Sequence, residues 1–124
     1  MSNAAPLLVF VSGPYTATTL RGVLDNIERA EAVGVDVIRA GHYPVIPHSL
    51  THGVHEAHTL TTGRELSWEW WMGWCEALIA RCDVVLKYAD SPGADREETF
   101  AVGLSIPVVA HVAQLAVIAR RRAA

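Results

Sequence analysis

Short apolar runs alternate along the chain with longer segments whose apolar residues recur at helical spacing. The runs cover residues 7–11, 43–46, 83–86 and 106–110, the lengths typical of buried strands. Helical spacing predicts helices over residues 18–40 and 66–81, a third from Ser91 and Pro92, and a last one over residues 113–122. Gly41 is a natural C′ residue for the first helix. We therefore expect an α/β fold, a Rossmann-like or flavodoxin-like three-layer sandwich around a mainly parallel sheet.

The segment over residues 47–63 is polar, rich in His and Thr, and has no convincing period. Pro47, Gly53 and the threonines oppose a helix, so we expect a long loop, and long loops are usually functional or mobile. If the segment were helical, its histidines could meet a zinc ion, a metal-dependent alternative. Those histidines are His48, His52, His55 and His58. We expect no metal, and His48, directly after the second strand, to line a cleft.

Two turns converge on one expected cleft. Right-handed crossovers favour the strand order 2-1-3-4, in which the chain changes direction between strands 1 and 3. Ligands of open α/β sheets bind outside the carboxyl ends of the strands at such a switch point. Candidate substrate-binding residues therefore follow strand 1 and strand 3: Ser12, Gly13 and Pro14, then Asp90, Ser91 and Gly93.

Glu97 is the candidate reactive group. It shares a helical face with Phe100, Ala101 and Leu104, whereas Glu98 lies one position round the helix and is the alternative. Ser91 is a natural N-cap with Pro92 at N1, and a helix N-terminus attracts anions. An acid on the buried side of a helix near a cleft is typical of a functional site.

Composition limits the partners and the compartment. The 124 residues are 51% hydrophobic and 19% charged, which suits a single domain over residues 1–124. The net charge of −3 argues against a nucleic-acid polymer as partner. No apolar run is long enough for a membrane span, and residues 1–5 lack the charged start of a signal peptide. We interpret Cys75 and Cys82 as reduced structural thiols of a cytoplasmic protein.

Four tryptophans gather in the helix predicted over residues 66–81: Trp68, Trp70, Trp71 and Trp74. We expect core packing or a subunit interface, with nucleobase stacking by one of them as the alternative. The sequence has no G-x-G-x-x-G, no Walker A and no G-x-S-x-G motif, which disfavours dinucleotide binding, NTP hydrolysis and serine hydrolase chemistry.

Several segments resemble the nucleoside 2-deoxyribosyltransferase superfamily, which includes nucleoside 5′-monophosphate N-glycosidases. They are Val9 to Tyr15, Cys82 to Val85, Ser91 to Glu97 with Ala101, and Ile106 to Val108. The resemblance spans strands 1 to 4, nearly the whole chain. The S-P-G-x-x-x-E element is its more specific part, and S-G-P-Y is the weaker one.

The resemblance implies cleavage of the bond between a base and a ribose or deoxyribose. Glu97 would attack the anomeric carbon and Tyr15 would hold its carboxylate. Ser91 and the backbone near Gly93 would bind a 5′-phosphate or a sugar hydroxyl. Family members commonly carry an Asp where this chain has Cys75. Glu76, beside it, is a candidate substitute, and the proton for the leaving base is otherwise unassigned.

We therefore expect an N-glycosidase or deoxyribosyltransferase-like enzyme for a nucleoside or nucleoside 5′-monophosphate. It needs no cofactor and forms a homodimer or a larger homo-oligomer. The alternative is a nucleotide-binding or sensing module that has kept the cleft and lost the chemistry, which Cys75 favours.

Overall fold

A computed structural model describes residues 5–124. Residues 1–4, where the expectation about a signal peptide and the start of the predicted domain fall, lie outside this range. In chain order the elements are β1 (Leu8–Ser12), α1 (Leu20–Arg39), β2 (Tyr43–Val45), α2 (Pro47–Thr62), α3 (Trp68–Ile79), β3 (Val84–Lys87), α4 (Pro92–Gly103), β4 (Val108–Val109), the 3₁₀ turn η1 (Val112–Gln114) and α5 (Leu115–Ala123).

The four strands form one parallel sheet in the order β2-β1-β3-β4, which confirms the predicted fold class and strand order. Phe10 lies between Val45 of β2 and Val85 of β3, at the centre of the sheet. Because the chain leaves β1 toward β2 on one side and continues at β3 on the other, the carboxyl ends of β1 and β3 form a switch point. Pro44 lies on the edge strand β2, where a missing N–H costs no central pairing.

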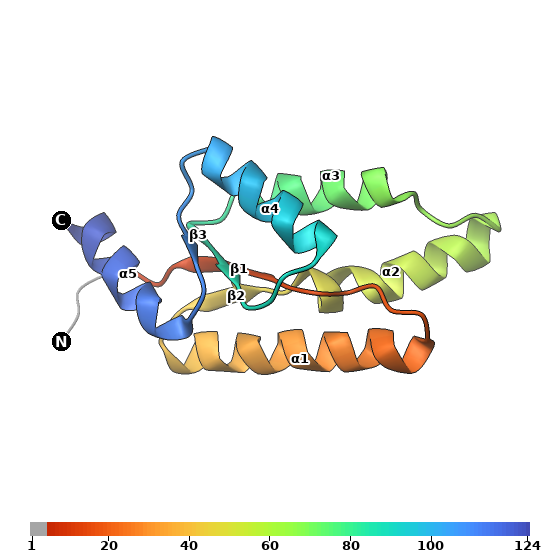
Figure 1. The fold of residues 1–124 in the computed structure, drawn as a ribbon, viewed down its shortest axis with the longest axis horizontal. Helices are drawn as coiled ribbons and strands as arrows, with labels where there is room; N and C mark the ends of the chain where they lie inside the picture. The colour runs from red at the N-terminus through yellow and green to blue at the C-terminus, as the bar shows by residue number, and fades with distance from the viewer. Residues whose placement is uncertain (1–4) are drawn as a thin grey trace.

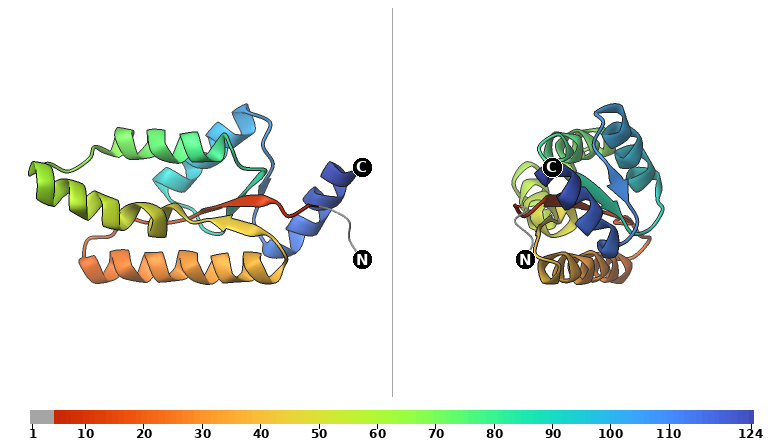
Figure 2. Two further views of the ribbon diagram at one scale, coloured as in Figure 1. Left: turned by 180° about the vertical axis from the view of Figure 1, so that it is seen from behind. Right: turned by 90° about the vertical axis from the view of Figure 1, so that its left-hand side faces the viewer.

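Helices cover both faces of the sheet, which gives three layers (Figures 1 and 2). One core cluster joins the sheet to α1 and α5 through Val9, Val37, Leu86 and Leu115, all buried. The other joins it to α3 and α4 through Phe10, Ile79, Val85 and Ala101. Strand residues thus alternate between two apolar cores, which explains why the strands appear in the sequence as continuous apolar runs.

The prediction of a loop over residues 47–63 is wrong, because this segment forms the helix α2. Pro47 occupies the first turn, where its missing N–H and fixed φ are compatible with a helix. Thr51, Thr59 and Thr62 donate their hydroxyls to carbonyls four residues earlier instead of competing with the helix. Gly63 ends α2 in the left-handed region at φ 71°. The helix is mostly exposed, so burial produces no clear apolar stripe in its sequence.

The other elements confirm the predicted types with shifted bounds. The first helix begins two residues late, at Leu20, because Thr19 accepts a hydrogen bond from the Gly22 N–H as N-cap. Gly41 follows this helix at φ 91°, as expected of a C′ glycine. The fourth strand shrinks to two residues, since only Val108 and Val109 pair with β3 residues, although Pro107 O accepts from the Val85 N–H at 2.9 Å. Within residues 5–124, no helix is long and apolar enough to cross a membrane.

Candidate functional site

Glu97 lies inside the molecule at the switch point. Its side chain is on the buried face of α4 with Ala94 and Ala101, and the residue is 6% exposed. Ser12, the last residue of β1, donates its hydroxyl to Glu97 Oε1 at 2.7 Å. The prediction that Glu97 faces inward is therefore confirmed. Leu104, expected on the same face, is 49% exposed because it follows the end of the helix.

Burial makes this carboxyl an unusually weak acid. Loss of water raises the pKa of Glu97 to about 7, and the nearby Glu76 charge adds to the effect. The Ser12 hydroxyl and the Cys75 thiol stabilise the anion and lower the pKa, but burial is the larger influence. Glu97 is therefore close to half ionised at neutral pH. A group with this pKa can act as an anion and can also carry a proton.

The N-terminus of α4 is capped as predicted. Ser91 Oγ accepts from the Ala94 N–H at 3.1 Å, and Pro92 follows in the first turn. Asp90 points into solvent, with its side chain 88% exposed, and pairs with Lys87 at 3.0 Å. A β-carbon at Gly93 would contact only Met72 Sδ at 3.8 Å. The Gly93 position is therefore roomy, which is compatible with close approach of a ligand.

Lys87 is a residue near the site that the sequence pattern did not indicate. It is the only lysine of the chain and ends β3. Its ammonium lies 2.7 Å from Asp95, 2.9 Å from Glu98 and 3.0 Å from Asp90, and the hydrogen bonds that it donates to these carboxylates raise its pKa. One signal was present in the sequence, a single cation at a strand end followed by four acids within eleven residues. The pairing uses Glu98, the alternative to Glu97, for a salt bridge.

The loop after β1 is held by two side chains from neighbouring helices. His48 Nε2, on α2, donates to Pro14 O at 2.9 Å and to Gly13 O at 3.2 Å. Asn26, on α1, donates to Tyr15 O at 3.0 Å. Burial lowers the pKa of His48, which favours the neutral ring, and its Nδ1 is buried without a hydrogen-bond partner. His48 thus lies beside the carboxyl end of β1 and fixes the loop backbone.

The expectation that Tyr15 holds the Glu97 carboxylate is not met in the structure. The Tyr15 hydroxyl instead pairs with His52 Nδ1 at 2.7 Å. No hydrogen bond joins Tyr15 to Glu97 in the part of the chain that the structure describes, and Ser12 takes that place. The reason is that α2 begins directly after β2 and places His52 against the loop. Because the sequence indicated a loop there, it gave no sign of this partner.

Gly13 allows the close approach of Tyr88, the residue that follows β3. A β-carbon at Gly13 would lie 2.1 Å from Tyr88 Cζ, so the ring could not keep its place. The Tyr88 hydroxyl is buried without a partner, and burial raises the pKa of Tyr88, with a smaller contribution from the Glu97 charge. Tyr88 therefore belongs to the surroundings of Glu97, although nothing in its sequence context pointed to it.

We expect Gly13→Ala to destabilise the fold by about 2 kcal/mol, because the Tyr88 ring must move out of a packed position. Gly53→Ala is the matched control. It lies within α2 with nothing within 4 Å of an added β-carbon, and should stabilise the protein by up to about 1 kcal/mol. Urea denaturation measures both free energies of unfolding. Equal stability of Gly13→Ala and the native protein would contradict the packing argument.

Glu76 and Cys75 take different roles on α3. Arg96 Nε donates to Glu76 Oε2 at 3.2 Å, and Arg96 also pairs with Glu69 at 2.8 Å. The Glu76 carboxylate is thus held in an ion pair. Cys75 is buried beside Glu97, and burial followed by the Glu97 charge raises the pKa of its thiol. Cys75 therefore faces the Glu97 carboxylate.

The histidines of α2 diverge toward separate partners. His52 pairs with Tyr15 and Glu56, His55 packs on Trp71 with ring centroids 5.1 Å apart, and His58 bonds to Arg64 O. No three His, Cys, Asp or Glu residues among positions 5–124 are arranged to hold a metal ion. Helicity alone therefore does not make these histidines a metal site.

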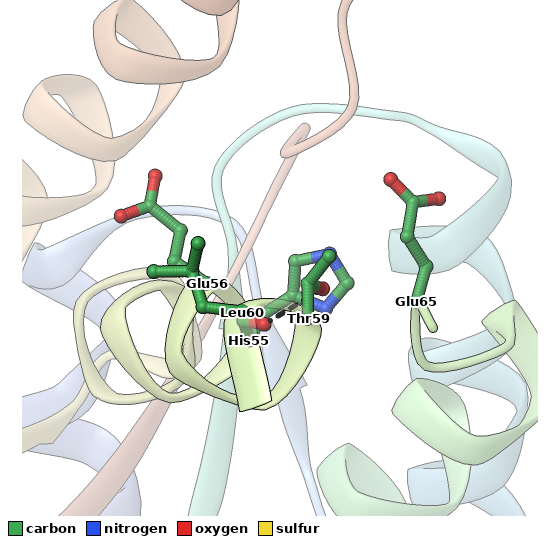
Figure 3. Close-up of a pocket in the computed structure, with 5 residues that line it drawn as sticks. All are labelled: His55, Glu56, Thr59, Leu60 and Glu65. Carbon is green, nitrogen blue, oxygen red and sulfur yellow. Dashed lines mark hydrogen bonds between the residues drawn. The ribbon is translucent and has the colours of Figure 1, made fainter. Parts of the chain in front are cut away.

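One open hollow lies on α3 and another lies beside α2, and Glu97 lines neither. The larger, about 530 Å³, is formed by Glu69, Trp70, Gly73 and Trp74. The smaller, about 320 Å³, lies between the outer end of α2 and Glu65 (Figure 3), and is lined by His55, Glu56, Thr59, Leu60 and Glu65. Trp68 and Trp70 are about half exposed, whereas Trp71 stacks on Trp74 at a centroid distance of 5.7 Å. Cys75 and Cys82 are buried free thiols.

Comparison with known proteins identifies the family. No curated protein matches the sequence. A family model described as a domain of unknown function, DUF1937, matches residues 7–113. The match runs from the start of β1 to η1 and includes Ser12, Tyr15, His52 and Glu97. This chain belongs to the DUF1937 family.

Proposed function

We propose that this protein is an N-glycosidase or a deoxyribosyltransferase-like enzyme that cleaves the base–sugar bond of a nucleoside or nucleoside 5′-monophosphate. One observation carries the proposal: a buried Glu97 carboxylate is held by the Ser12 hydroxyl at the carboxyl ends of β1 and β3. This is the position at which open parallel sheets bind ligands. The resemblance to the nucleoside 2-deoxyribosyltransferase superfamily supports the same residue as the nucleophile.

The chemistry suits an ionised carboxylate in a site with little water. Cleavage of an N-glycosidic bond develops positive charge at the anomeric carbon, and a nearby carboxylate stabilises that charge and can trap it covalently. Ser12 holds one oxygen of Glu97 and so orients the attacking group. Water then releases the sugar, whereas a second base gives transfer. Neither step needs a cofactor.

The start of α4 is the proposed binding place for a phosphate or a sugar hydroxyl. Backbone N–H groups at a helix N-terminus favour an anion, and Ser91 and Gly93 lie there. Lys87 is already surrounded by three carboxylates, so it offers a phosphate no free charge. We expect backbone groups, rather than this lysine, to contact the ligand.

A nucleotide-binding or sensing module is the second candidate. Glu97 is 6% exposed, so covering side chains must move before a sugar can reach it. Tyr15 is engaged by His52, and Cys75 stands at the position of the expected acid. A protein that binds a nucleotide without cleaving it would tolerate both features.

We also propose that the protein acts in the cytoplasm as a homodimer or a larger homo-oligomer, without a nucleic-acid polymer or a membrane as partner. The buried free thiols suit a reducing compartment. The half-exposed Trp68 and Trp70 on α3 are the candidate subunit contact.

Base release separates the two candidates. The purified protein is incubated with ribo- and deoxyribonucleosides and their 5′-monophosphates, and the free base is quantified by chromatography. The expected result is release of base from at least one compound, with the sugar or sugar phosphate as co-product. If no compound is cleaved while a nucleotide still raises the melting temperature, the binding module is correct and the enzyme proposal fails.

A further inference from the structure

One hydrogen bond and one ion-pair contact connect three side chains from the loop after β1 to the surface of α2. The Tyr15 hydroxyl pairs with His52 Nδ1 at 2.7 Å, and His52 Nε2 lies 3.2 Å from Glu56 Oε1. The three groups have different degrees of exposure. Tyr15 is half-buried, the His52 side chain is 21% exposed, and the Glu56 side chain is 59% exposed. The three side chains therefore connect a half-buried phenol to solvent through one imidazole.

The charge of Glu56 selects the tautomer of His52. An ionised carboxylate 3.2 Å from Nε2 favours a proton on that nitrogen, and the neutral ring then offers Nδ1 as an acceptor for the Tyr15 hydroxyl. When His52 gains a second proton, Nδ1–H donates to the Tyr15 oxygen and frees the phenol hydrogen for another acceptor. An imidazole oriented by a carboxylate and bonded to a hydroxyl is the general arrangement for proton transfer to or from that hydroxyl.

The phenol is placed for such a role by the same loop that carries Ser12. His48 and Asn26 hold the loop backbone through Pro14 O and Tyr15 O. The ring of Tyr15 also packs near His48 and Trp71, with centroid distances of 5.5 and 6.4 Å. Burial, with a smaller contribution from Glu56, raises the pKa of Tyr15, which keeps the phenol a proton donor rather than a phenolate.

We propose that Tyr15, His52 and Glu56 form a proton relay that protonates the leaving base. The inference rests on the proposed N-glycosidase function and supplies the acid that Cys75 and the paired Glu76 cannot. Tyr15 is the catalytic residue of the relay, whereas His52 supplies the proton and Glu56 is a positioning residue. Figure 3 shows Glu56 on the side of α2 away from the His55 ring, at the rim of the smaller hollow.

The step begins with His52 protonated on both ring nitrogens. The bond between the anomeric carbon and the base nitrogen breaks, and its electron pair goes to the base. The phenol proton of Tyr15 moves to the base while the Nδ1 proton of His52 moves to the Tyr15 oxygen. The Glu97 carboxylate bonds to the anomeric carbon. Water then displaces Glu97, and the proton that water loses returns through Tyr15 to His52, which restores the starting state.

Leaving-group dependence tests the relay. Tyr15→Phe and His52→Gln are compared on the nucleotide that the native protein cleaves fastest and on the 4-nitrophenyl β-glycoside of the same sugar. A nitrophenolate leaves without a proton, so an acid catalyst matters only for the nucleotide. We expect each variant to lose about 10²-fold or more in kcat on the nucleotide, and less than about tenfold on the nitrophenyl glycoside. Glu56→Gln should show a smaller loss with the same selectivity.

Two substitutions of the same residue types away from the relay serve as controls. Tyr43→Phe, on the exposed edge of β2, and His58→Gln, at the far end of α2, should keep native rates on both compounds. Equal loss on both compounds, or no loss on either, would overturn the relay, because Tyr15 and His52 would then only stabilise the loop. If the native protein cleaves neither compound, the proposed function itself fails and the relay fails with it.

Discussion

Glu97→Gln should abolish base release from every nucleoside and nucleotide that the native protein cleaves. The amide keeps the size of the side chain and an oxygen for the Ser12 hydroxyl, but it carries no negative charge and is a poor nucleophile. We expect kcat to fall by at least about 10³-fold, the order of loss seen when an enzyme nucleophile is removed. Measurement of free base over hours at high protein concentration makes so low a rate detectable.

Glu98→Gln is the control for this change. Glu98 is the next residue of α4 and pairs with Lys87 at 2.9 Å, so the substitution removes one carboxylate from the same helix without touching Ser12. Base release by Glu98→Gln should stay within a few-fold of the native rate. Glu97→Gln should still bind the nucleotide, which is measured as a rise in its melting temperature. Full activity of Glu97→Gln would exclude the nucleophile that the proposal assigns.

The second large effect is on stability, and it depends on pH. Glu97 has a pKa of about 7 in the folded protein against an ordinary value of 4.5. Between these values the folded state binds more protons than the unfolded state, so the contribution of Glu97 to stability falls as pH rises from about 4.5 and levels off above about 7. The total loss is roughly 3 kcal/mol, from about 1.4 kcal/mol per pKa unit.

Glu97→Gln removes this dependence because an amide does not titrate. Urea denaturation of both proteins at pH values from 4 to 8 measures the difference in free energy of unfolding. We expect the difference to shift by roughly 3 kcal/mol in favour of Glu97→Gln between pH 4 and pH 8. Other carboxylates titrate in both proteins and cancel in the difference. A difference that stays constant across this range would show that Glu97 has an ordinary pKa.

Taken together, the two effects of this substitution describe a carboxyl group kept at a cost to stability. A buried acid near a helix start is less stable ionised than a glutamine in the same place, yet the sequence places an acid there. Loss of stability without gain in packing is typical of functional sites. An increase in stability of Glu97→Gln together with a loss of base release would therefore connect the electrostatics of the site to its chemistry.

The sequence alone determined the elements that local pattern controls. The apolar runs of β1 and β3 are buried on both faces, so their residues are apolar without interruption and the strands are recognisable. Ser91 and Pro92 mark the start of α4 because capping depends on adjacent residues. These strands and the handedness of crossovers predicted the strand order, and the strand order predicted the switch point. Helical spacing predicted that Glu97 faces inward.

Only the tertiary structure decided which side chains meet at that point. The helix α2 is exposed and polar, so its sequence lacks an apolar stripe, and its threonines bond within the helix in a way that composition does not reveal. Without α2 as a helix, the contact of His52 with Tyr15 could not be predicted. Ser12 is bonded to Glu97 across a separation of 85 residues. Such contacts depend on how strands and helices pack in three dimensions, so the spacing of residues along the chain does not predict them.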